Sequence, residues 1–234
     1  MTKEERIDDV ATKYAKMFQM QYDLNLATCG DEWVGDVCKS TGKPINWNLA
    51  ILDECSELLG STDWKWWKSG KTDDLNIGLE LADVLHFKLS RIMSEYGGLL
   101  DPSDVDTYAQ VVTELGDLLE INEYNIVDYL QDVLDNENNM IQIMTGYWIL
   151  ARNMGYSFDD LYHIYILKNR LNHFRQENGY TDGTYVKDWI YNGVVEEDNH
   201  ILMKIFSEYD NGNEQDMDDA MLEFGELYRK VNDV

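Results

Sequence analysis

The sequence predicts an all-α protein built as a helical bundle. Apolar residues recur at intervals of three and four over most of the 234-residue chain, which is the spacing of one face of an α-helix. Prolines, which interrupt helices, occur only at Pro44 and Pro102, and few alternating β-branched runs compete with the helical pattern. A chain of this length can bury a large core, so we expect a single domain over residues 1–234.

Three helices are predicted in the first part of the chain. Residues 3–28 form the first of them, with apolar positions at Val10, Tyr14, Met17, Phe18, Tyr22 and Leu24. After a turn-rich segment, the helical pattern resumes over about 46–60. It breaks across GSTDWKWWKSGKTDD and returns over about 73–96, until a glycine pair and Asp101-Pro102 end it.

The second part of the chain continues the helical pattern. The apolar spacing over 103–155 predicts two or three amphipathic helices rich in surface acids. They lie within a variable region, about 97–160, in which we place no motif. Another helix is expected over about 157–172, followed by the loop FRQENGYTDGTYVKDW. Two closing helices are expected over about 196–209 and 214–231, after an unusual Val-Val element at 194–195.

The composition excludes several classes of partner. The net charge is −26, and because binding to nucleic acid or to an anionic membrane draws on clustered cations, neither partner is expected. No apolar stretch approaches the length of a membrane span, and the start, MTKEERIDDV, lacks the apolar core of a signal peptide. Cys29, Cys38 and Cys55 are an odd number without C-x-x-C spacing, which argues against a disulfide framework or a thiolate zinc site. We therefore expect a soluble protein of the cytoplasm, or of the host cytoplasm if it is phage-encoded.

Two of the predicted helices carry carboxylates on or beside their apolar faces. Glu54 and Glu57 form an E-x-x-E pair in the first, and Glu80 and Asp83 form an E-x-x-D pair in the second. A separation of three residues puts both members of each pair on one helical face. Because a short connection makes the two helices antiparallel neighbours, we expect all four carboxylates to point into the same space.

Such a cluster needs cations, or the pKa values of its carboxylates must rise sharply. Removing each carboxylate from water is costly and like charges repel, so four together are not a packing device. Neither helix carries a basic residue on the relevant face near the pairs, which makes a divalent metal the better partner. Oxygen ligands without His or Cys favour Mg²⁺ or Mn²⁺ over Zn²⁺. The alternative is that Glu57 and Asp83 only flank the apolar stripe and face water.

The connection between these two helices is aromatic and basic. Three tryptophans in four positions suggest a hydrophobic plug, and core burial is the default expectation for each of them. Lysines interleaved with aromatic planes beside a carboxylate cluster also suit a nucleotide base and its phosphates. The residues concerned are Trp64, Lys65, Trp66, Trp67, Lys68 and Lys71.

A second basic cluster lies at 168–187. Lys168, Asn172 and Arg175 fall on one helical stripe, and Lys187 follows in the loop. In so acidic a protein this concentration of cations indicates a local anion site. The alternative is a solvated basic helix end.

These motifs resemble a known family. E-x-x-E, 22 intervening residues and E-x-x-D are similar to the metal-binding pattern of the all-α nucleoside triphosphate pyrophosphohydrolases, the MazG-like superfamily. Three segments resemble the dimeric all-α dUTPases and, with MQYDLN, cover about 20–190. They are INWNLAILDECSELLGSTDWKWWK, LELADVLHFKLS and KNRLNHFRQENGYTDGTYVKDW.

The resemblance implies an enzyme that hydrolyses dUTP, and also dUDP, to dUMP with Mg²⁺-activated water, keeps uracil out of DNA, and works as a homodimer that closes on its substrate. Its metal ligands would be Glu54, Glu57, Glu80 and Asp83, with Glu54 or Glu57 orienting the water. Gln21 and Asn25 would read the uracil edge, and Trp64, His86 and Phe87 would surround the base and sugar. The phosphate-binding set would be Lys65, Lys168, Asn172, Arg175, Tyr180 and Lys187, with Tyr185 a weaker match.

Several alternatives stay open. His86 suits a satisfied structural histidine as well as a substrate contact. A sibling enzyme acting on dCTP or another nucleotide would share the metal motif, because an amide such as Asn25 can flip to suit uracil or cytosine. A non-catalytic acidic helical binding protein would explain the charge, but neither the carboxylates on apolar faces nor the basic cluster.

Overall fold

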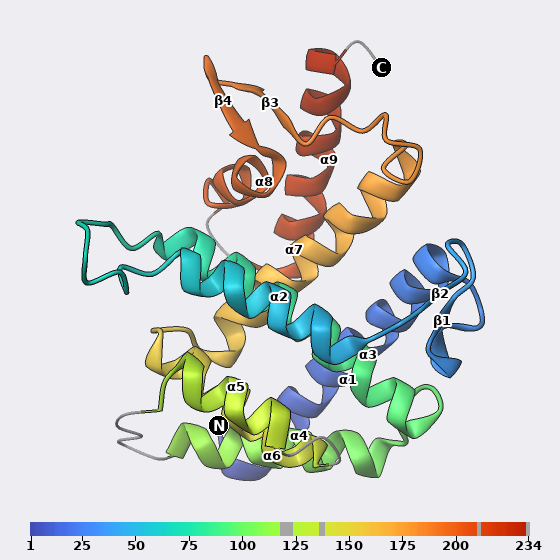
Figure 1. The fold of residues 1–234 in the computed structure, drawn as a ribbon, viewed down its shortest axis with the longest axis vertical. Coiled ribbons are helices and arrows are strands. Elements are labelled where there is room, and N and C mark those ends of the chain that lie inside the picture. Colours follow the sequence, from blue (N-terminus) through green and yellow to red (C-terminus); the bar gives the residue numbers. More distant parts are fainter. Residues whose placement is uncertain (118–123, 136–138, 210–211, 233–234) are drawn as a thin grey trace. The chain divides into compact units, whose positions relative to one another are not determined.

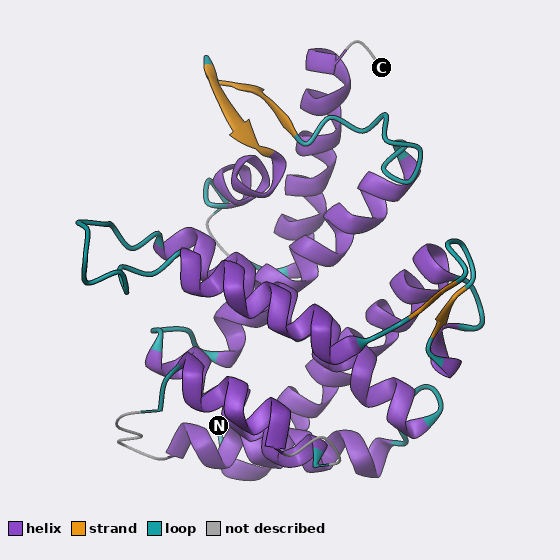
Figure 2. Ribbon diagram, in the orientation of Figure 1, coloured by secondary structure: helices purple, strands orange, loops and turns teal. Residues whose placement is uncertain are grey.

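The computed structural model describes residues 1–117, 124–135, 139–209 and 212–232. Within these ranges the regular structure is helical apart from two short antiparallel hairpins, which confirms the all-α class (Figures 1 and 2). None of the helices in these ranges is both long and apolar enough to cross a membrane. The chain separates into two compact units, Met1–Tyr162 and His163–Val234. The single domain expected over 1–234 stays a prediction.

The first unit contains the helices predicted over 3–28, 46–60 and 73–96, each confirmed to within two residues, and three more helices in the variable region. Its helices are α1 (Lys3–Cys29), α2 (Trp47–Gly60), α3 (Asp74–Tyr96), α4 (Pro102–Asp117), α5 (Ile126–Asp135) and α6 (Met140–Asn153). The turn-rich segment after α1 forms a 3₁₀ turn at Trp33–Gly35 and a hairpin of β1 (Val37–Cys38) and β2 (Lys43–Pro44).

An aromatic core anchors α1 in this unit. The ring of Tyr14 is fully buried and contacts the rings of Phe18, Tyr108, Trp148 and Phe158, with centroids 5.3–6.3 Å away. The Trp148 indole also donates to the Tyr14 hydroxyl at 2.5 Å. Burying large rings is strongly favourable, so the helix that carries Gln21 and Asn25 is held firmly at its centre.

Helices α2 and α3 lie side by side and run antiparallel (Figure 1). The carboxylate of Asp73 caps the start of α3 by accepting from the backbone N–H of Asn76 at 3.1 Å. At the other end, Gly97 has φ 74° and ends the helix in the left-handed conformation. The backbone N–H of Asp73 donates to the carbonyl of Ser61 at 2.9 Å, which closes the base of the loop between the two helices. The carboxylate pairs therefore lie near this closed end.

The second unit is built on the end of α7 (Phe158–Glu177), a helix that begins in the first unit and runs five residues beyond its predicted end. Buried Phe174 extends its apolar pattern into the segment predicted as a loop. The prediction of a helix from 196 is wrong at its start, because residues 194–197 form a strand. The remaining elements are β3 (Asp188–Tyr191), β4 (Val194–Glu197), α8 (Asp198–Phe206) and α9 (Glu214–Asn232).

Candidate active site

Three carboxylates from α2 and α3 meet on one face of the first unit. An oxygen from each of Glu54, Glu57 and Glu80 lies within 4.8 Å of the other two. Glu80 is buried, Glu54 is half-buried and Glu57 is exposed, so the cluster opens to solvent on the α2 side. The structure thus brings together three of the four side chains that the spacing singled out as metal ligands.

The donor set fits a hard divalent cation. Three carboxylates at this distance repel one another unless a cation or a proton lies among them. Their oxygens are the ligands that Mg²⁺ and Mn²⁺ prefer, and no thiol or imidazole belongs to the group. The exposure of Glu57 leaves room for water ligands, which Mg²⁺ usually keeps.

Asp83 lies one helical turn beyond Glu80 and is half-buried. Its Oδ1 is 4.0 Å from Nδ1 of His86, and that nitrogen is 2.7 Å from the carbonyl of Ala82. The short contact to a carbonyl means that Nδ1 carries the proton, so the ring is oriented by its own helix. Asp83 is not in the group of three, and its place among the metal ligands stays a prediction.

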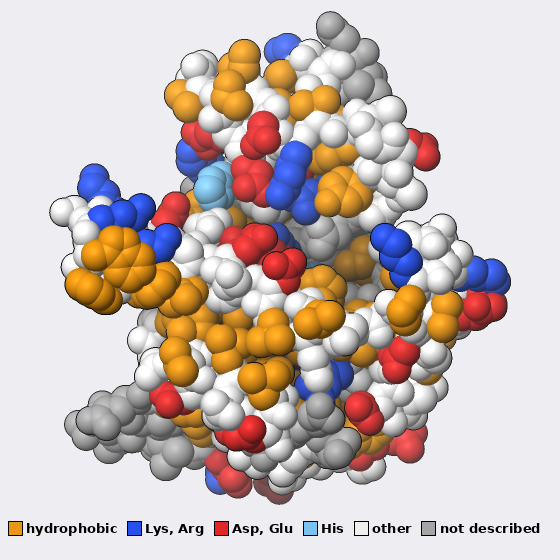
Figure 3. All heavy atoms as spheres, viewed as in Figure 1, with side chains coloured by type: hydrophobic (Ala, Val, Ile, Leu, Met, Phe, Trp, Pro, Cys, Tyr) orange, Lys and Arg blue, Asp and Glu red, His pale blue; other side chains and the backbone are white. Residues whose placement is uncertain are grey.

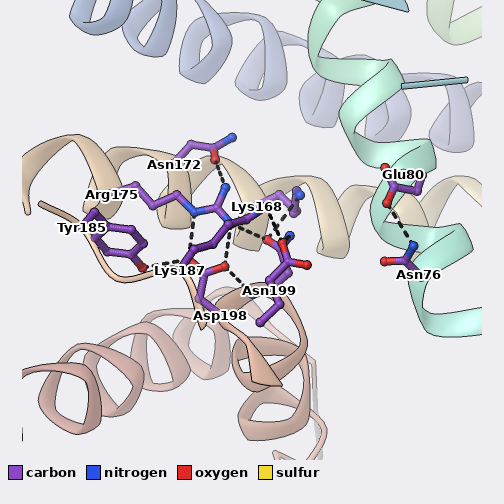
Figure 4. Close-up of polar contacts among 10 residues, drawn as sticks. Asn76, Glu80, Lys168, Asn172, Arg175, Tyr185, Lys187, Asp198 and Asn199 are labelled. Carbon is purple, nitrogen blue, oxygen red and sulfur yellow. Dashed lines mark hydrogen bonds and ion pairs between the residues drawn. The ribbon is translucent and has the colours of Figure 1, made fainter. Parts of the chain in front are cut away.

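Asn76 orients Glu80, a role that the sequence analysis missed. Its side-chain amide donates to Glu80 Oε1 at 3.0 Å and to Ser61 Oγ at 2.6 Å, and Figure 4 shows the amide pointing at the carboxylate. Ser61 in turn lies at the end of α2, where its hydroxyl donates to the Glu57 carbonyl at 3.3 Å. One amide therefore ties the carboxylate of α3 to the end of the helix that carries Glu54 and Glu57.

The two amides expected to read a base belong to a buried network between α1 and α3. Gln21 donates to Asn25 Oδ1 at 2.9 Å, and Asn25 Nδ2 donates to the hydroxyl of Ser90 at 2.9 Å. Ser90 donates to the carbonyl of His86 at 2.9 Å. All four residues are buried, so these bonds fix the orientation of the Asn25 amide. Ser90 was not predicted as a site residue.

Phe87 and Trp64, the other aromatic candidates for base contact, lie near opposite ends of α2. The ring of Phe87 lies 6.4 Å from that of Trp47, at the start of α2. Trp64 follows the opposite end of α2, and the helix between them is about 20 Å long. Trp64 instead packs edge-on against Trp67 at 5.2 Å. The structure therefore does not bring Trp64 to Phe87.

The expectation of core burial for the three tryptophans is wrong. Trp64, Trp66 and Trp67 are 43 %, 89 % and 56 % exposed, and they pack on one another in the loop that extends from the ends of α2 and α3. Lys65 Nζ lies 5.7 Å from the Trp64 ring centroid. Figure 3 shows hydrophobic and basic side chains together on this loop. Closure of the loop at Asp73 and Ser61 keeps its rings outside the helical core.

In the second unit, Arg175 is held by an acid that sequence reasoning missed. The guanidinium of Arg175 binds Asp198 at two points, 2.9 Å for Nε–Oδ2 and 2.6 Å for Nη2–Oδ1 (Figure 4). It also donates to Asn172 Oδ1 at 3.0 Å and to Asn199 Oδ1 at 3.1 Å. The hydroxyl of Tyr185 donates to Asp198 Oδ2 at 2.8 Å, and burial together with the nearby carboxylate raises the pKa of Tyr185.

The two lysines of the predicted phosphate set join the same cluster. Buried Lys168 donates to Asn199 Oδ1 at 3.3 Å, and Lys187 pairs with Glu197 Oε1 at 2.6 Å. Burial alone would lower the pKa of Lys187, but the hydrogen bond and the charge of Glu197 raise it overall. The cations of this cluster are thus arranged by a Glu-Asp-Asn run that begins where β4 ends and α8 starts.

The loop after α7 is shaped by its glycines. Gly179 has φ 91°, and a Cβ there would lie 2.0 Å from the hydroxyl oxygen of Thr184, so only glycine fits. Its carbonyl accepts from Thr184 N at 3.0 Å, and Tyr180 N donates to the Arg175 carbonyl at 2.9 Å. Tyr180 is half exposed, and its ring lies 6.3 Å from that of Tyr185.

The missed residues carry weak sequence signals. Asp198 and Glu197 are two acids among 45, and nothing local separates a buried acid from a solvated one. A polar residue at the start of a helix, as at Asn76, suggests first a cap. Only the positions of their partners, up to 31 residues away for Lys168 and Asn199, distinguish these side chains.

The comparisons with known proteins agree with the motifs. A family model described as dUTPase matches residues 13–180, which is more than half of the chain and includes the acidic cluster, the amide network and Arg175. No curated protein matches the chain.

Proposed function

The chain belongs to the dUTPase family, and from that membership we propose how its residues carry out the reaction. As a member it is a nucleotide pyrophosphohydrolase, a dUTP diphosphatase. We propose that Glu54, Glu57 and Glu80, with Asp83, hold Mg²⁺, for which Mn²⁺ can substitute. Support comes from the oxygen-only donor set and from the close approach of three carboxylates, which a divalent cation among them would stabilise.

The chemistry is water attack on a phosphoanhydride. When bound, Mg²⁺ supplies positive charge to the phosphate oxygens and lowers the pKa of a nearby water. Glu54 or Glu57 accepts the proton of the attacking water as its oxygen bonds to phosphorus. The phosphoanhydride link between the α- and β-phosphates is broken, giving dUMP and pyrophosphate. Asn76 keeps Glu80 oriented while this happens.

The proposed substrate contacts follow the two polar clusters. Gln21 and Asn25 read the uracil edge, beside His86 and Phe87, with Trp64 also assigned to the base and sugar. Arg175 holds phosphate oxygens through the side of its guanidinium not bound to Asp198, because charge-assisted hydrogen bonds to phosphate are strong. The other members of the phosphate set are Lys65, Lys168, Asn172, Tyr180 and Lys187.

The single observation that carries this proposal is the meeting of Glu54, Glu57 and Glu80 within 4.8 Å. Glu80→Gln keeps the shape of the side chain and removes its charge. We expect it to lower kcat for dUTP at least about 100-fold, with unchanged helical circular dichroism. The matched control is Asp53→Asn, an exposed carboxylate on the same helix as Glu54, which should leave the rate unchanged. Equal activity of both variants would refute the metal site.

Three further properties are proposed from the family resemblance. We propose that the enzyme also hydrolyses dUDP, that it is a homodimer and that it works in the cytoplasm. Phosphate release from dUDP tests the first, and light scattering during gel filtration tests the second. A monomer at the concentrations used for the assay would contradict the dimer.

A further inference from the structure

Two cysteines meet where the first hairpin is fastened to the end of α1. Cys29 is the last residue of α1, and Cys38 lies in β1. The backbone N–H of Lys39 donates to the Cys29 carbonyl at 2.7 Å, and Ser40 Oγ donates to the Thr28 carbonyl at 2.9 Å. These bonds hold β1 against the helix end, so neighbouring side chains on the two segments are kept in contact.

The thiols of Cys29 and Cys38 lie close enough that each shifts the pKa of the other. Both are half-buried and neither is in a disulfide, whereas Cys55, the third cysteine, is buried in the core. The sulfur of Cys38 also lies 3.2 Å from Ser40 Oγ. A close pair of reduced, partly accessible thiols, on segments held together by backbone hydrogen bonds, is the arrangement from which a disulfide can form.

The two sulfurs differ in their readiness to ionise. Burial tends to raise the pKa of Cys38, but hydrogen bonds with Ser40, Thr41 and Cys29 outweigh it and bring the pKa to about 7. Burial and the neighbouring Cys38 thiol raise the pKa of Cys29 to about 12. Cys38 is therefore the thiol that ionises first, and Cys29 stays protonated beside it.

We propose that Cys29 and Cys38 are a site of reversible oxidation by hydroperoxides, with Cys38 as the attacking thiol and Cys29 as the resolving thiol. The inference is independent of the proposed active site, because it involves neither the acidic cluster nor the basic one.

The reaction balances in two steps. The Cys38 thiolate attacks one oxygen of hydrogen peroxide, the O–O bond breaks, and the released hydroxide takes up a proton, leaving a sulfenic acid and water. The negative charge on Cys38, which helped to keep Cys29 protonated, is then lost. Cys29 gives up its proton and attacks the sulfenic sulfur, the S–O bond breaks, and a second water leaves. In sum, two thiols are oxidised to one disulfide while one peroxide is reduced to two waters.

Mass spectrometry of the full-length protein treated with dilute hydrogen peroxide tests the proposal. We expect the mass to fall by about 2 Da, as two thiol hydrogens are lost, and dithiothreitol to restore it. Proteolysis of the oxidised protein should yield one peptide pair joined between Cys29 and Cys38. Cys55 serves as an internal control, because its burial should leave it reduced.

Two variants separate the roles of the thiols. Cys29→Ser should stop at the Cys38 sulfenic acid, which dimedone traps, whereas Cys38→Ser should take up no dimedone at Cys29. Circular dichroism checks that both variants fold, and the wild-type cross-link can be read without them. Absence of the Cys29–Cys38 peptide pair in oxidised wild type, or disulfides only between molecules, would overturn the proposal.

Discussion

Arg175 and Asp198 form a buried ion pair with two parallel hydrogen bonds, of 2.9 and 2.6 Å. The side chain of Asp198 is fully buried and that of Arg175 nearly so, with exposures of 0 % and 9 %. A pair with this geometry presets the direction of the guanidinium before any anion binds. The proposed phosphate site therefore depends on an acid that contacts no phosphate itself.

Asp198→Asn should unfold the second unit more easily and weaken catalysis. The change leaves the Arg175 cation buried without its counter-charge, and breaking such a pair costs about 3–5 kcal/mol. The free energy of unfolding in urea measures the effect. Asp218→Asn is the matched control, because exposed Asp218 pairs at 2.7 Å with half-buried Arg170, which lies on the same helix as Arg175. It should cost less than about 1 kcal/mol. Equal losses would show that the Asp198 pair has no special role.

Asn76→Ala should raise the Mg²⁺ requirement. The Asn76 side chain bonds both Glu80 and Ser61. When these two bonds are lost, the carboxylate of Glu80 is free to turn away from the cluster. Loss of a residue that orients a metal ligand typically weakens metal binding about 10–100-fold. The Mg²⁺ concentration that gives half-maximal dUTP hydrolysis is the measurement. Gln19→Ala, at an exposed site on α1, is the control. An unchanged Mg²⁺ curve for Asn76→Ala would contradict the positioning role.

Ser90→Ala should reduce the preference for dUTP over dCTP. Ser90 fixes the Asn25 amide by accepting from its Nδ2 at 2.9 Å, and without that bond the amide can flip and accept the cytosine edge. The loss of one buried hydrogen bond corresponds to about a tenfold change in the ratio of kcat/KM values. Ser94→Ala, one turn later on α3, is the control, since Ser94 bonds Asp36 and not Asn25. A constant ratio in Ser90→Ala would exclude this source of selectivity.

Lys88→Met should flatten the pH dependence of stability. Lys88 is 2 % exposed and donates to the Ile143 carbonyl at 2.7 Å. Its burial lowers its pKa well below the usual value, and the nearby charge of Arg91 lowers it further. The unfolded lysine binds its proton up to about pH 10.4, so between the two pKa values the unfolded state holds more protons. Wild-type stability should therefore rise with pH in that window, and the variant should lack this rise.

Urea unfolding of both proteins from about pH 7 to about pH 9.5, below the ionisation of tyrosine, measures this difference. The free energy of wild type should increase relative to Lys88→Met by up to about 1.4 kcal/mol per pH unit. A difference between the two proteins that stays constant over the range would mean that Lys88 does not titrate there.

Much of the first unit could be read from periodicity. The helices predicted over 3–28, 46–60 and 73–96 match α1, α2 and α3 because each carries a continuous apolar face and a local stop signal. The spacing of the acids was also enough to predict that Glu54, Glu57 and Glu80 meet, because two consecutive helices joined by a loop of this kind pack antiparallel.

The tryptophan loop and the second unit could not be read in this way. Hydrophobicity alone favours burial of Trp66, yet it is 89 % exposed, because the loop closes at its base and leaves the rings outside the core. The strand at 194–197 is stabilised by pairing with β3, and that partner is not evident from the residues of the strand itself.

The sequence by itself determined the all-α class, most helix bounds and the identity of the acidic cluster, because each depends on residues a few positions apart on one helix or on two consecutive ones. Only the tertiary structure decided that Asp198 orients Arg175, that Ser90 holds Asn25 and that Cys29 meets Cys38. These contacts join separate elements, and a side chain's burial and partners depend on how the elements pack. The local sequence around each residue is compatible with a solvated side chain as well as with a bound one.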